Sequence, residues 1–224
     1  MVSPMSFTKK IAEDLKNELL ELFHALHNGT INLSGVNCAF ITLLPKCDTP
    51  LKITDYRPIA LQHSIPKLIA KVLSNRLQPK IKYLVDQMQS GFIQGRSIIE
   101  NFTMAVEMIQ CAHKYKQPIF VLKLDFQKAF DTVHWEALLH IMTVRGFPAT
   151  WVNRHMLVTS QAQILINGAA GPKFNIQKGV RQGDPLSPYL FDLTVEVLQQ
   201  MFKKAYHNNF LLHPLCQGAP LPVL

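Results

Sequence analysis

The sequence lacks several features that would point to common classes of protein. Its four cysteines (Cys38, Cys47, Cys111 and Cys216) form no C-x-x-C pair, and no set of cysteines and histidines has the spacing of a zinc finger. We therefore expect reduced thiols and an intracellular location. Residues 1–10 lack the apolar core of a signal peptide, and no apolar run is long enough to span a bilayer, so we expect no membrane partner.

Acidic side chains are scarce. Fifteen Asp and Glu against 23 Lys and Arg give a formal net charge of +8. Residues 43–96 carry nine basic and three acidic side chains, a net charge of +6 that is most of the total. This concentration favours a track for nucleic acid, although a solvated surface is the alternative for any single lysine.

Internal repeats, low-complexity segments and an obvious linker are absent as well. The 224 residues, 48% of them hydrophobic, suffice for one or two globular domains with a sizeable core. Apolar spacing and turn signals predict helices over residues 7–27, 64–78, 97–115, 133–144, 148–160 and 187–206, and strands over 36–44, 57–61, 121–124, 161–166 and 173–177. We expect Pro79 to end or kink the second helix. The mixture predicts an α+β fold.

The first stretch that carries chemistry is residues 121–131, VLKLDFQKAFD. Its apolar residues predict a buried strand that ends at Asp125. A carboxylate in that place can hold Mg²⁺, which prefers oxygen ligands and substrate phosphates. The alternative is a polar strand end without chemistry. We expect Asp131 to cap the helix that follows.

The second stretch is residues 179–191, GVRQGDPLSPYLF. Gly179 and Gly183 predict a loop whose backbone can approach a ligand closely. Arg181 and Gln182 lie between them and can reach a phosphate and a base or sugar. The Ser-Pro pair that follows predicts the start of a helix. Taken alone, this stretch is only a loop-to-helix junction.

Together the two stretches resemble motifs A and B of reverse transcriptases, most closely those of non-LTR (LINE-type) retrotransposons. The resemblance runs on through residues 41–46 (ITLLPK), 55–61 (DYRPIAL), 71–77 (KVLSNRL), 89–96 (QSGFIQGR) and 166–168 (ING), in the order of the family. Several independent blocks in the right order are far more specific than a lone glycine pattern. Intron-encoded maturases share motifs A and B, but residues 57–61 and 75–77 favour the LINE-type family.

The resemblance implies a right-hand polymerase: the fingers and part of the palm, with a split βαβ-type antiparallel sheet and no thumb. The implied regions are an N-terminal helix (residues 1–30), the fingers (31–117) and a partial palm with motifs A and B (118–224). In the family, a Tyr/Phe-Ala-Asp-Asp turn follows and supplies further catalytic carboxylates. No Ala-Asp-Asp occurs in this sequence, so we expect the chain to stop before that motif.

The implied activity is RNA-directed DNA polymerisation with two Mg²⁺ ions, on an RNA template, a DNA primer and deoxynucleoside triphosphates. By resemblance, Asp125 is the catalytic residue and metal ligand, and the backbone of Phe126 touches the triphosphate. Phe130 stacks under the sugar and excludes a 2′ hydroxyl, unless it is simply a core aromatic. Lys46 and Arg57 face the triphosphate, with a salt bridge to Asp55 as the alternative for Arg57.

The remaining implied contacts lie on the nucleic-acid side. Gln182 and Gly183 would line the nucleotide and the template. The basic residues expected to contact nucleic acid are Lys67, Lys71, Arg76, Arg96 and Arg181. Since motif A offers one metal carboxylate, we expect this chain alone to be catalytically incomplete; the alternatives are a non-catalytic nucleic-acid-binding remnant and a maturase-type reverse transcriptase.

Overall fold

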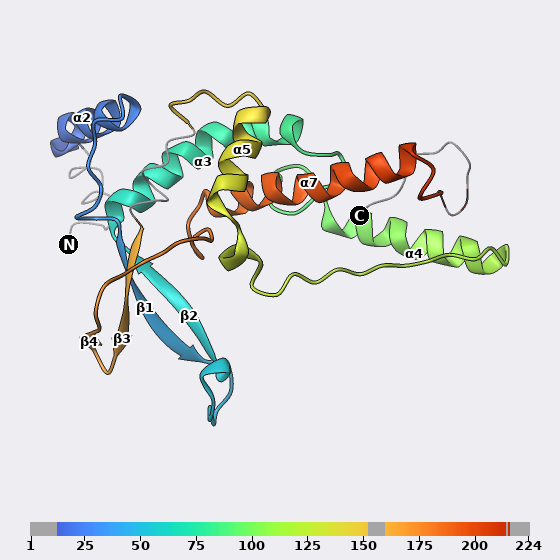
Figure 1. Ribbon diagram of the computed structural model, residues 1–224, viewed down its shortest axis with the longest axis horizontal. Coiled ribbons are helices and arrows are strands. Elements are labelled where there is room, and N and C mark those ends of the chain that lie inside the picture. Colours follow the sequence, from blue (N-terminus) through green and yellow to red (C-terminus); the bar gives the residue numbers. More distant parts are fainter. Residues whose placement is uncertain (1–12, 152–159, 214, 216–224) are drawn as a thin grey trace, which may run out of the picture.

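A mixed sheet joins strands that lie far apart in the sequence. The computed structural model describes residues 13–151, 160–213 and 215. Its strands are β1 (Cys38–Pro45), β2 (Tyr56–Gln62), β3 (Gln161–Ile166), β4 (Ala169–Ala170) and β5 (Phe174–Asn175). The β1–β2 hairpin projects away from the helices (Figure 1). Strand β3 lies on the other side of β1, and both β4 and β5 pair with β3.

Four of the five predicted strands are found close to their expected positions, as β1, β2, β3 and β5, but the expectation of an antiparallel sheet is only partly right. Strand β1 pairs antiparallel with β2 and parallel with β3. A parallel pair needs a long crossover, and residues 46–160, whose described part contains β2 and three α-helices, provide it. The sheet also joins a strand of the predicted palm to strands of the predicted fingers, so the boundary at residue 118 stays a prediction.

The α-helices of the described residues are α2 (Lys16–His27), α3 (Ser64–Leu84), α4 (Ile98–Lys114), α5 (Trp135–Val144) and α7 (Ser187–His207). Helices α4, α5 and α7 begin and end within two residues of their predicted bounds. The start predicted for the first helix, at residue 7, lies outside the described residues. The helix predicted over residues 148–160 falls mostly outside the described residues. No helix in the described ranges is both long and apolar enough to cross a membrane.

The sequence predicts that Pro79 ends or kinks this helix; α3 continues past Pro79 to Leu84, so the predicted end is wrong. A proline inside a helix costs about 3 kcal/mol, because it removes one hydrogen bond and crowds the preceding turn. The apolar face nevertheless continues to Ile81, which is fully buried. Burial of such a side chain contributes roughly 1.5–3 kcal/mol, and this packing offsets the proline.

The sequence predicts that Asp131 caps the next helix, and this prediction is wrong. Asp131 belongs to the short 3₁₀-helix η2 (Ala129–Thr132), and α5 begins only after His134, without a side-chain cap. The carboxylate of Asp131 instead accepts a hydrogen bond from the Gln182 amide, 3.3 Å away. The turn of η2 thus separates Asp131 from the helix and directs it toward the loop before α7.

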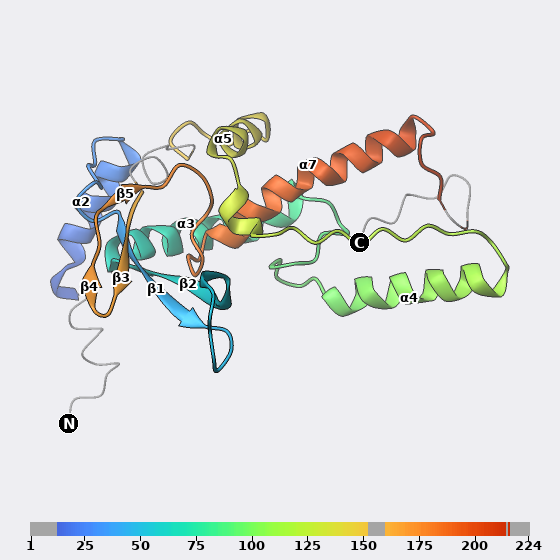
Figure 2. The same cartoon turned by 60° about the horizontal axis from the view of Figure 1, so that its bottom comes forward.

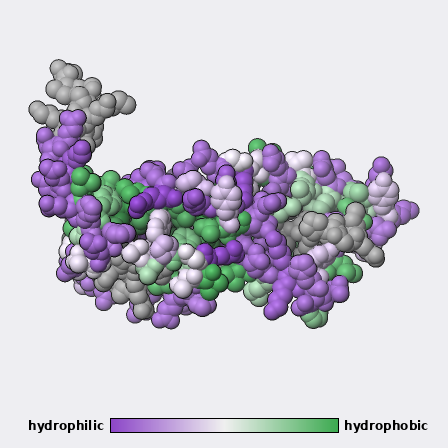
Figure 3. All heavy atoms as spheres, turned by 90° about the horizontal axis from the view of Figure 1, so that it is seen from above, coloured by the Kyte–Doolittle hydropathy of each residue, from purple (hydrophilic) through white to green (hydrophobic). Residues whose placement is uncertain are grey.

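The expected buried strand at residues 121–124 is wrong. The chain there is extended, but Val121, Leu122 and Leu124 are exposed, and no described strand pairs with it. It returns along α4 toward η2 (Figures 1 and 2). A strand needs a hydrogen-bonded neighbour, whatever its apolar content. Elsewhere, too, apolar side chains reach the surface in patches between hydrophilic ones (Figure 3).

The main core holds α3, α5 and α7 together with the two motif stretches. Its buried residues are Ile81, Val85, Ile93, Val133, Leu138, Met142, Val180, Leu190 and Leu193. Val133 follows η2 directly, and Val180 lies in the loop before α7. Because both are anchored in one core, motifs A and B are fixed relative to each other.

Charged groups are buried along α7. Glu196 accepts hydrogen bonds from Arg145 (3.0 Å) and from the backbone amide of Asp86 (2.8 Å). Asp86 is also paired with Lys203. Asp192 accepts one hydrogen bond from Gln89, at 2.9 Å, while its other carboxylate oxygen is buried without a partner. Burial raises the pKa of Asp192 to about 6, from an ordinary value of 3.8.

This raised pKa predicts a pH-dependent effect of Asp192→Asn. The folded state holds the proton at pH 4–6, where the unfolded chain releases it, so this group's contribution to stability falls as pH rises through that window. Asparagine removes the buried charge. In urea unfolding, the free energy of unfolding of Asp192→Asn relative to that of the parent should therefore rise by roughly 1–3 kcal/mol between pH 4.5 and pH 7.5. The same difference between the two proteins at both pH values would contradict the prediction.

Candidate functional site

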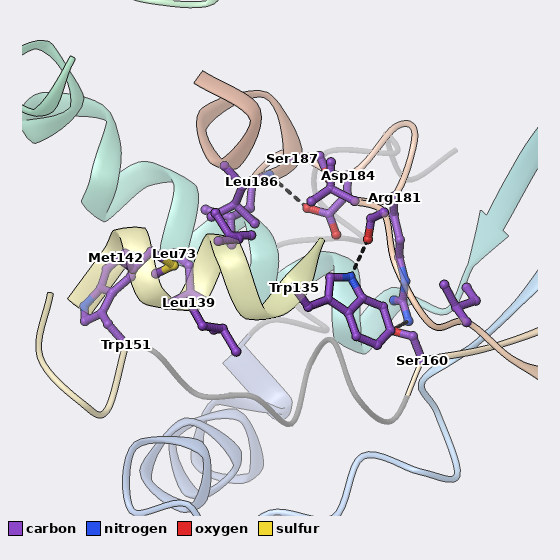
Figure 4. A pocket seen from close by; sticks show the side chains of 15 residues that line it. Leu73, Trp135, Leu139, Met142, Trp151, Ser160, Arg181, Asp184, Leu186 and Ser187 are labelled. Carbon is purple, nitrogen blue, oxygen red and sulfur yellow. Dashed lines mark hydrogen bonds between the residues drawn. The ribbon is translucent and has the colours of Figure 1, made fainter. Parts of the chain in front are cut away.

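Three hydrogen bonds join the motif B loop before α7 to the end of motif A and the residues that follow it. The backbone amide of Val180 donates to the carbonyl oxygen of Phe130 at 2.8 Å, and the amide of Gly179 donates to that of Val133 at 2.7 Å. The indole Nε1 of Trp135 donates to the Gly179 carbonyl oxygen at 2.7 Å, as the dashed line in Figure 4 marks. The loop before α7 is therefore tied to η2 and to the first residue of α5.

Phe130 lies at this junction. Its ring stacks on Phe191 of α7 with centroids 5.1 Å apart, and it is half-buried against the main core. Packing against the core and contact with a ligand are not exclusive for a side chain in this position, since part of the ring stays accessible. The proposed contact with a sugar remains a prediction.

Gln182 and Gly183 lie on the exposed side of the same junction. The hydrogen bond from Gln182 to Asp131 brings the two motifs together a second time. Gly183 has a φ of +84°, and a Cβ at that position would meet nothing within 4 Å. The structure thus gathers Phe130, Asp131, Gln182 and Gly183 at one edge, with open space over the last glycine.

Arg181 points inward from the same loop. Its guanidinium donates to the Asn37 carbonyl oxygen at 3.3 Å, to the Asn37 side chain and to the Ser160 hydroxyl at 2.9 Å. Burial lowers the pKa of Arg181, and the charge of Asp184 acts against that shift. Arg181 therefore links the loop to the residues that precede β1 and β3. Its contact with nucleic acid stays a prediction. The hydrogen bonds to Asn37 and Ser160 do not favour that contact, because they already use the guanidinium group.

Asp184 orders the loop before α7. Its carboxylate accepts a hydrogen bond from the Leu186 backbone amide at 2.8 Å. Burial raises the pKa of Asp184, although this hydrogen bond and the nearby charge of Arg181 lower it. The carboxylate thus serves the turn into α7, and Figure 4 shows it beside Arg181 at the edge of an apolar pocket.

Arg96 also uses its guanidinium internally. It donates to the carbonyl oxygens of Asp86, Gln89 and Lys82, the last at 3.0 Å. These bonds fasten residues 85–96 to the end of α3, whose terminal carbonyls lack partners within the helix. Nucleic-acid binding by Arg96 stays a prediction.

The basic residues of α3 divide between two sides of the helix. Lys67, Lys71, Arg76 and Lys82 are all exposed. With about 100° between successive residues, Lys67, Lys71 and Lys82 fall within about 60° of one another, whereas Arg76 lies about 180° from Lys67. The structure therefore brings Lys67 and Lys71 together and places Arg76, with Lys80, on the opposite side.

The β1–β2 hairpin carries Lys46 and Arg57. Lys46 donates to the Thr54 carbonyl oxygen at 2.7 Å, so its ammonium group braces the hairpin tip. The Asp55 carboxylate accepts from the backbone amides of Lys52 and Leu51, which lower its pKa. Asp55 is thus occupied locally, and within the described chain Arg57 is exposed without a salt bridge to it.

Asp125 and Phe126 lie in the exposed extended segment before η2. Within residues 13–151, 160–213 and 215, no group of three Asp, Glu, His or Cys side chains is placed to hold a metal ion. The carboxylate of Asp125 is a suitable oxygen ligand for Mg²⁺, but it is the one ligand predicted in this segment. Its metal role stays a prediction.

Sequence reasoning missed the residues that hold the junction together. The sequence predicts that Gly179 lets the loop backbone approach a ligand, not another segment of the chain, and it assigns Trp135 no role. Asn37 and Ser160, which accept from Arg181, lie 144 and 21 residues away from it in the chain. The one signal available was local: a tryptophan four residues after Asp131 needs a partner for its indole N–H when it is buried.

Known proteins match this chain over most of its length. The family model described as reverse transcriptase (RNA-dependent DNA polymerase) matches residues 44–213. A transposon TX1 149 kDa protein of Xenopus laevis is 28% identical over 86% of this chain and 15% of its own length. The R2DM polyprotein of Drosophila melanogaster is 27% identical over 73% of this chain and 16% of its own.

A third relative, an R2 polyprotein of Nasonia vitripennis, is 30% identical over 70% of this chain and 14% of its own length. The chain thus corresponds to about a seventh of the length of these relatives. The family model covers well over half of the chain, and the relatives come from R2 and similar retroelements, as the resemblance in sequence implied. The chain belongs to the reverse transcriptase family, in its LINE-type, non-LTR branch.

Proposed function

We propose that this chain acts in RNA-directed DNA synthesis by a LINE-type retroelement, binding an RNA template, a DNA primer and deoxynucleoside triphosphates. The observation that carries the proposal is the junction of motifs A and B. It fixes Phe130, Gln182 and Gly183 at one edge, beside the segment that bears Asp125. These are the residues that the family resemblance assigns to the incoming nucleotide and its metal.

Each residue then has a chemical task. The Asp125 carboxylate would hold Mg²⁺, and the metal would neutralise charge on the triphosphate during attack by the primer 3′ hydroxyl. Phe130 would lie under the sugar, where a 2′ hydroxyl would clash with its ring. Gln182 and Gly183 would line the nucleotide and the template, with no side chain at Gly183 to obstruct them. Arg57, exposed on β2, would pair with phosphate oxygens.

The template would follow the face of α3 that carries Lys67 and Lys71. Both side chains are exposed, and neighbouring Lys82 extends the same face. Phosphate contacts of this kind position a strand without reading its sequence. They also make binding depend on salt, because each contact releases counterions.

This track predicts that Lys67→Gln with Lys71→Gln weakens binding of an RNA–DNA duplex and flattens its salt dependence. The slope of log affinity against log salt should fall by about 1.5–2, since two phosphate contacts are lost. Fluorescence anisotropy between 50 and 200 mM salt would measure it. Arg76→Gln with Lys80→Gln is the matched control, because it removes the same charge from the opposite side of α3. Equal slopes in the two double variants would place the track elsewhere.

Chemistry by the 224 residues alone is expected to be absent. A two-metal site needs more anionic ligands than Asp125 and a triphosphate supply, and loss of such ligands costs orders of magnitude in rate. A primer-extension assay on an RNA template, with Mg²⁺ or Mn²⁺, would test this. Extension by the parent that disappears in Asp125→Asn would contradict the expectation.

A preference for the complementary nucleotide would distinguish a polymerase domain from a general nucleic-acid-binding protein, and it can be measured in the same assay mixture. The next complementary deoxynucleotide with Mg²⁺ should slow dissociation of the template–primer complex more than a mismatched one does. A plain nucleic-acid-binding protein would show no such preference, and that outcome would refute the proposed function.

A further inference from the structure

Gly179 permits an unusually close approach between motif A and motif B. A Cβ at this position would lie 2.9 Å from both the Cα and the carbonyl oxygen of Asp131. These are backbone atoms, so they cannot rotate out of the way as a flexible side chain could. The residue also has a φ of +91°, which favours glycine. Any other residue would have to push η2 and the loop before α7 apart.

Trp135 holds the same approach from the other side. Its indole N–H donates to the Gly179 carbonyl oxygen, while the Gly179 amide donates to Val133. Both polar groups of the Gly179 backbone are therefore bonded to motif A or to the residues that follow it. Figure 4 shows the indole lying in the pocket wall with its nitrogen turned toward the loop. The half-buried ring fixes the direction of this bond.

The contacts on either side of Gly179 lead to the proposed nucleotide edge. Val180, the next residue, donates to the Phe130 carbonyl oxygen. Gln182, three residues on, donates to Asp131. Since Phe130 is also stacked on Phe191 of α7, a displacement at Gly179 changes how the ring and the Gln182 amide sit relative to each other.

We propose that Trp135 and Gly179 are positioning residues that set the height of the Phe130 ring, and thereby the selectivity of the site for deoxyribose over ribose. The inference rests on the proposed function, because it needs a nucleotide beside Phe130. Neither residue touches the sugar. Discrimination of a single hydroxyl by a ring edge depends on sub-ångström placement, which packed backbone contacts provide and a free loop does not.

The geometry can be tested without any nucleotide. The chain has two tryptophans, so its ¹H–¹⁵N spectrum holds two indole signals, which Trp151→Phe assigns. The Trp135 signal should be shifted downfield and slow to exchange with solvent. Gly179→Ala should move it and speed its exchange. Gly146→Ala is the matched control, since Gly146 also has a positive φ (+78°) but open space around a Cβ. An unmoved Trp135 signal in Gly179→Ala would overturn the inference.

Selectivity is then measured by calorimetry on the template–primer complex with Mg²⁺, titrating dUTP and UTP, which differ only in the 2′ hydroxyl, opposite adenine. Gly179→Ala and Trp135→Phe should each reduce the ratio of the two affinities by roughly tenfold, mainly by improving UTP binding. Gly146→Ala and Trp151→Phe should keep the parental ratio. A purely structural role would weaken both nucleotides together, and an unchanged ratio beside a moved indole signal would overturn the inference. A parent that binds neither nucleotide would instead refute the proposed function, and with it any role at a sugar.

Discussion

The structure depends on one close backbone contact, between Gly179 and Asp131. A Cβ at Gly179 would lie only 2.9 Å from the Cα and the carbonyl oxygen of Asp131, so there is room for the hydrogen atom of a glycine and for nothing larger. This approach lets the loop before α7 form backbone hydrogen bonds to Phe130 and Val133, and it brings Trp135 within bonding distance of the loop. The aromatic pair, the Gln182–Asp131 bond and the shared core then follow, because each requires η2 and α7 at this separation.

Two of the five basic residues assigned to nucleic acid are used to build the protein. Arg96 fastens residues 85–96 to the end of α3, and Arg181 binds Asn37 and Ser160. Guanidinium groups suit such tasks, because they offer several donors in a rigid plane and stay charged even when partly buried. The other three are exposed on α3, but they do not share a face: Lys67 and Lys71 lie on one side and Arg76 on the opposite one. One side of α3 therefore offers a phosphate backbone fewer charges than the charge count suggested.

Helices and strands with a regular spacing of apolar residues could be predicted from the sequence. Helices α4 and α7 and strands β1 to β3 lie close to their expected bounds because their apolar spacing is regular. The errors share another cause. Pro79 was overridden by burial of Ile81, Asp131 was drawn to Gln182, and residues 121–124 lack a pairing partner among the described strands. Each of these three outcomes depends on a tertiary contact, or on the lack of one, which the local sequence pattern does not contain.

The candidate site shows the same division between local and tertiary information. The residue types at Asp125, Phe130 and Gln182 could be recognised from motifs, since their chemistry is carried by the sequence. The placement of Phe130 next to Gln182 could not, because it depends on contacts of Trp135 and Gly179, which carry no chemistry of their own. A glycine in a loop usually indicates flexibility, but Gly179 has the opposite effect: because it has no side chain, the loop before α7 and η2 can come close enough to form backbone hydrogen bonds. Selectivity at such a site is therefore expected to be as sensitive to residues that never reach the ligand as to those that do.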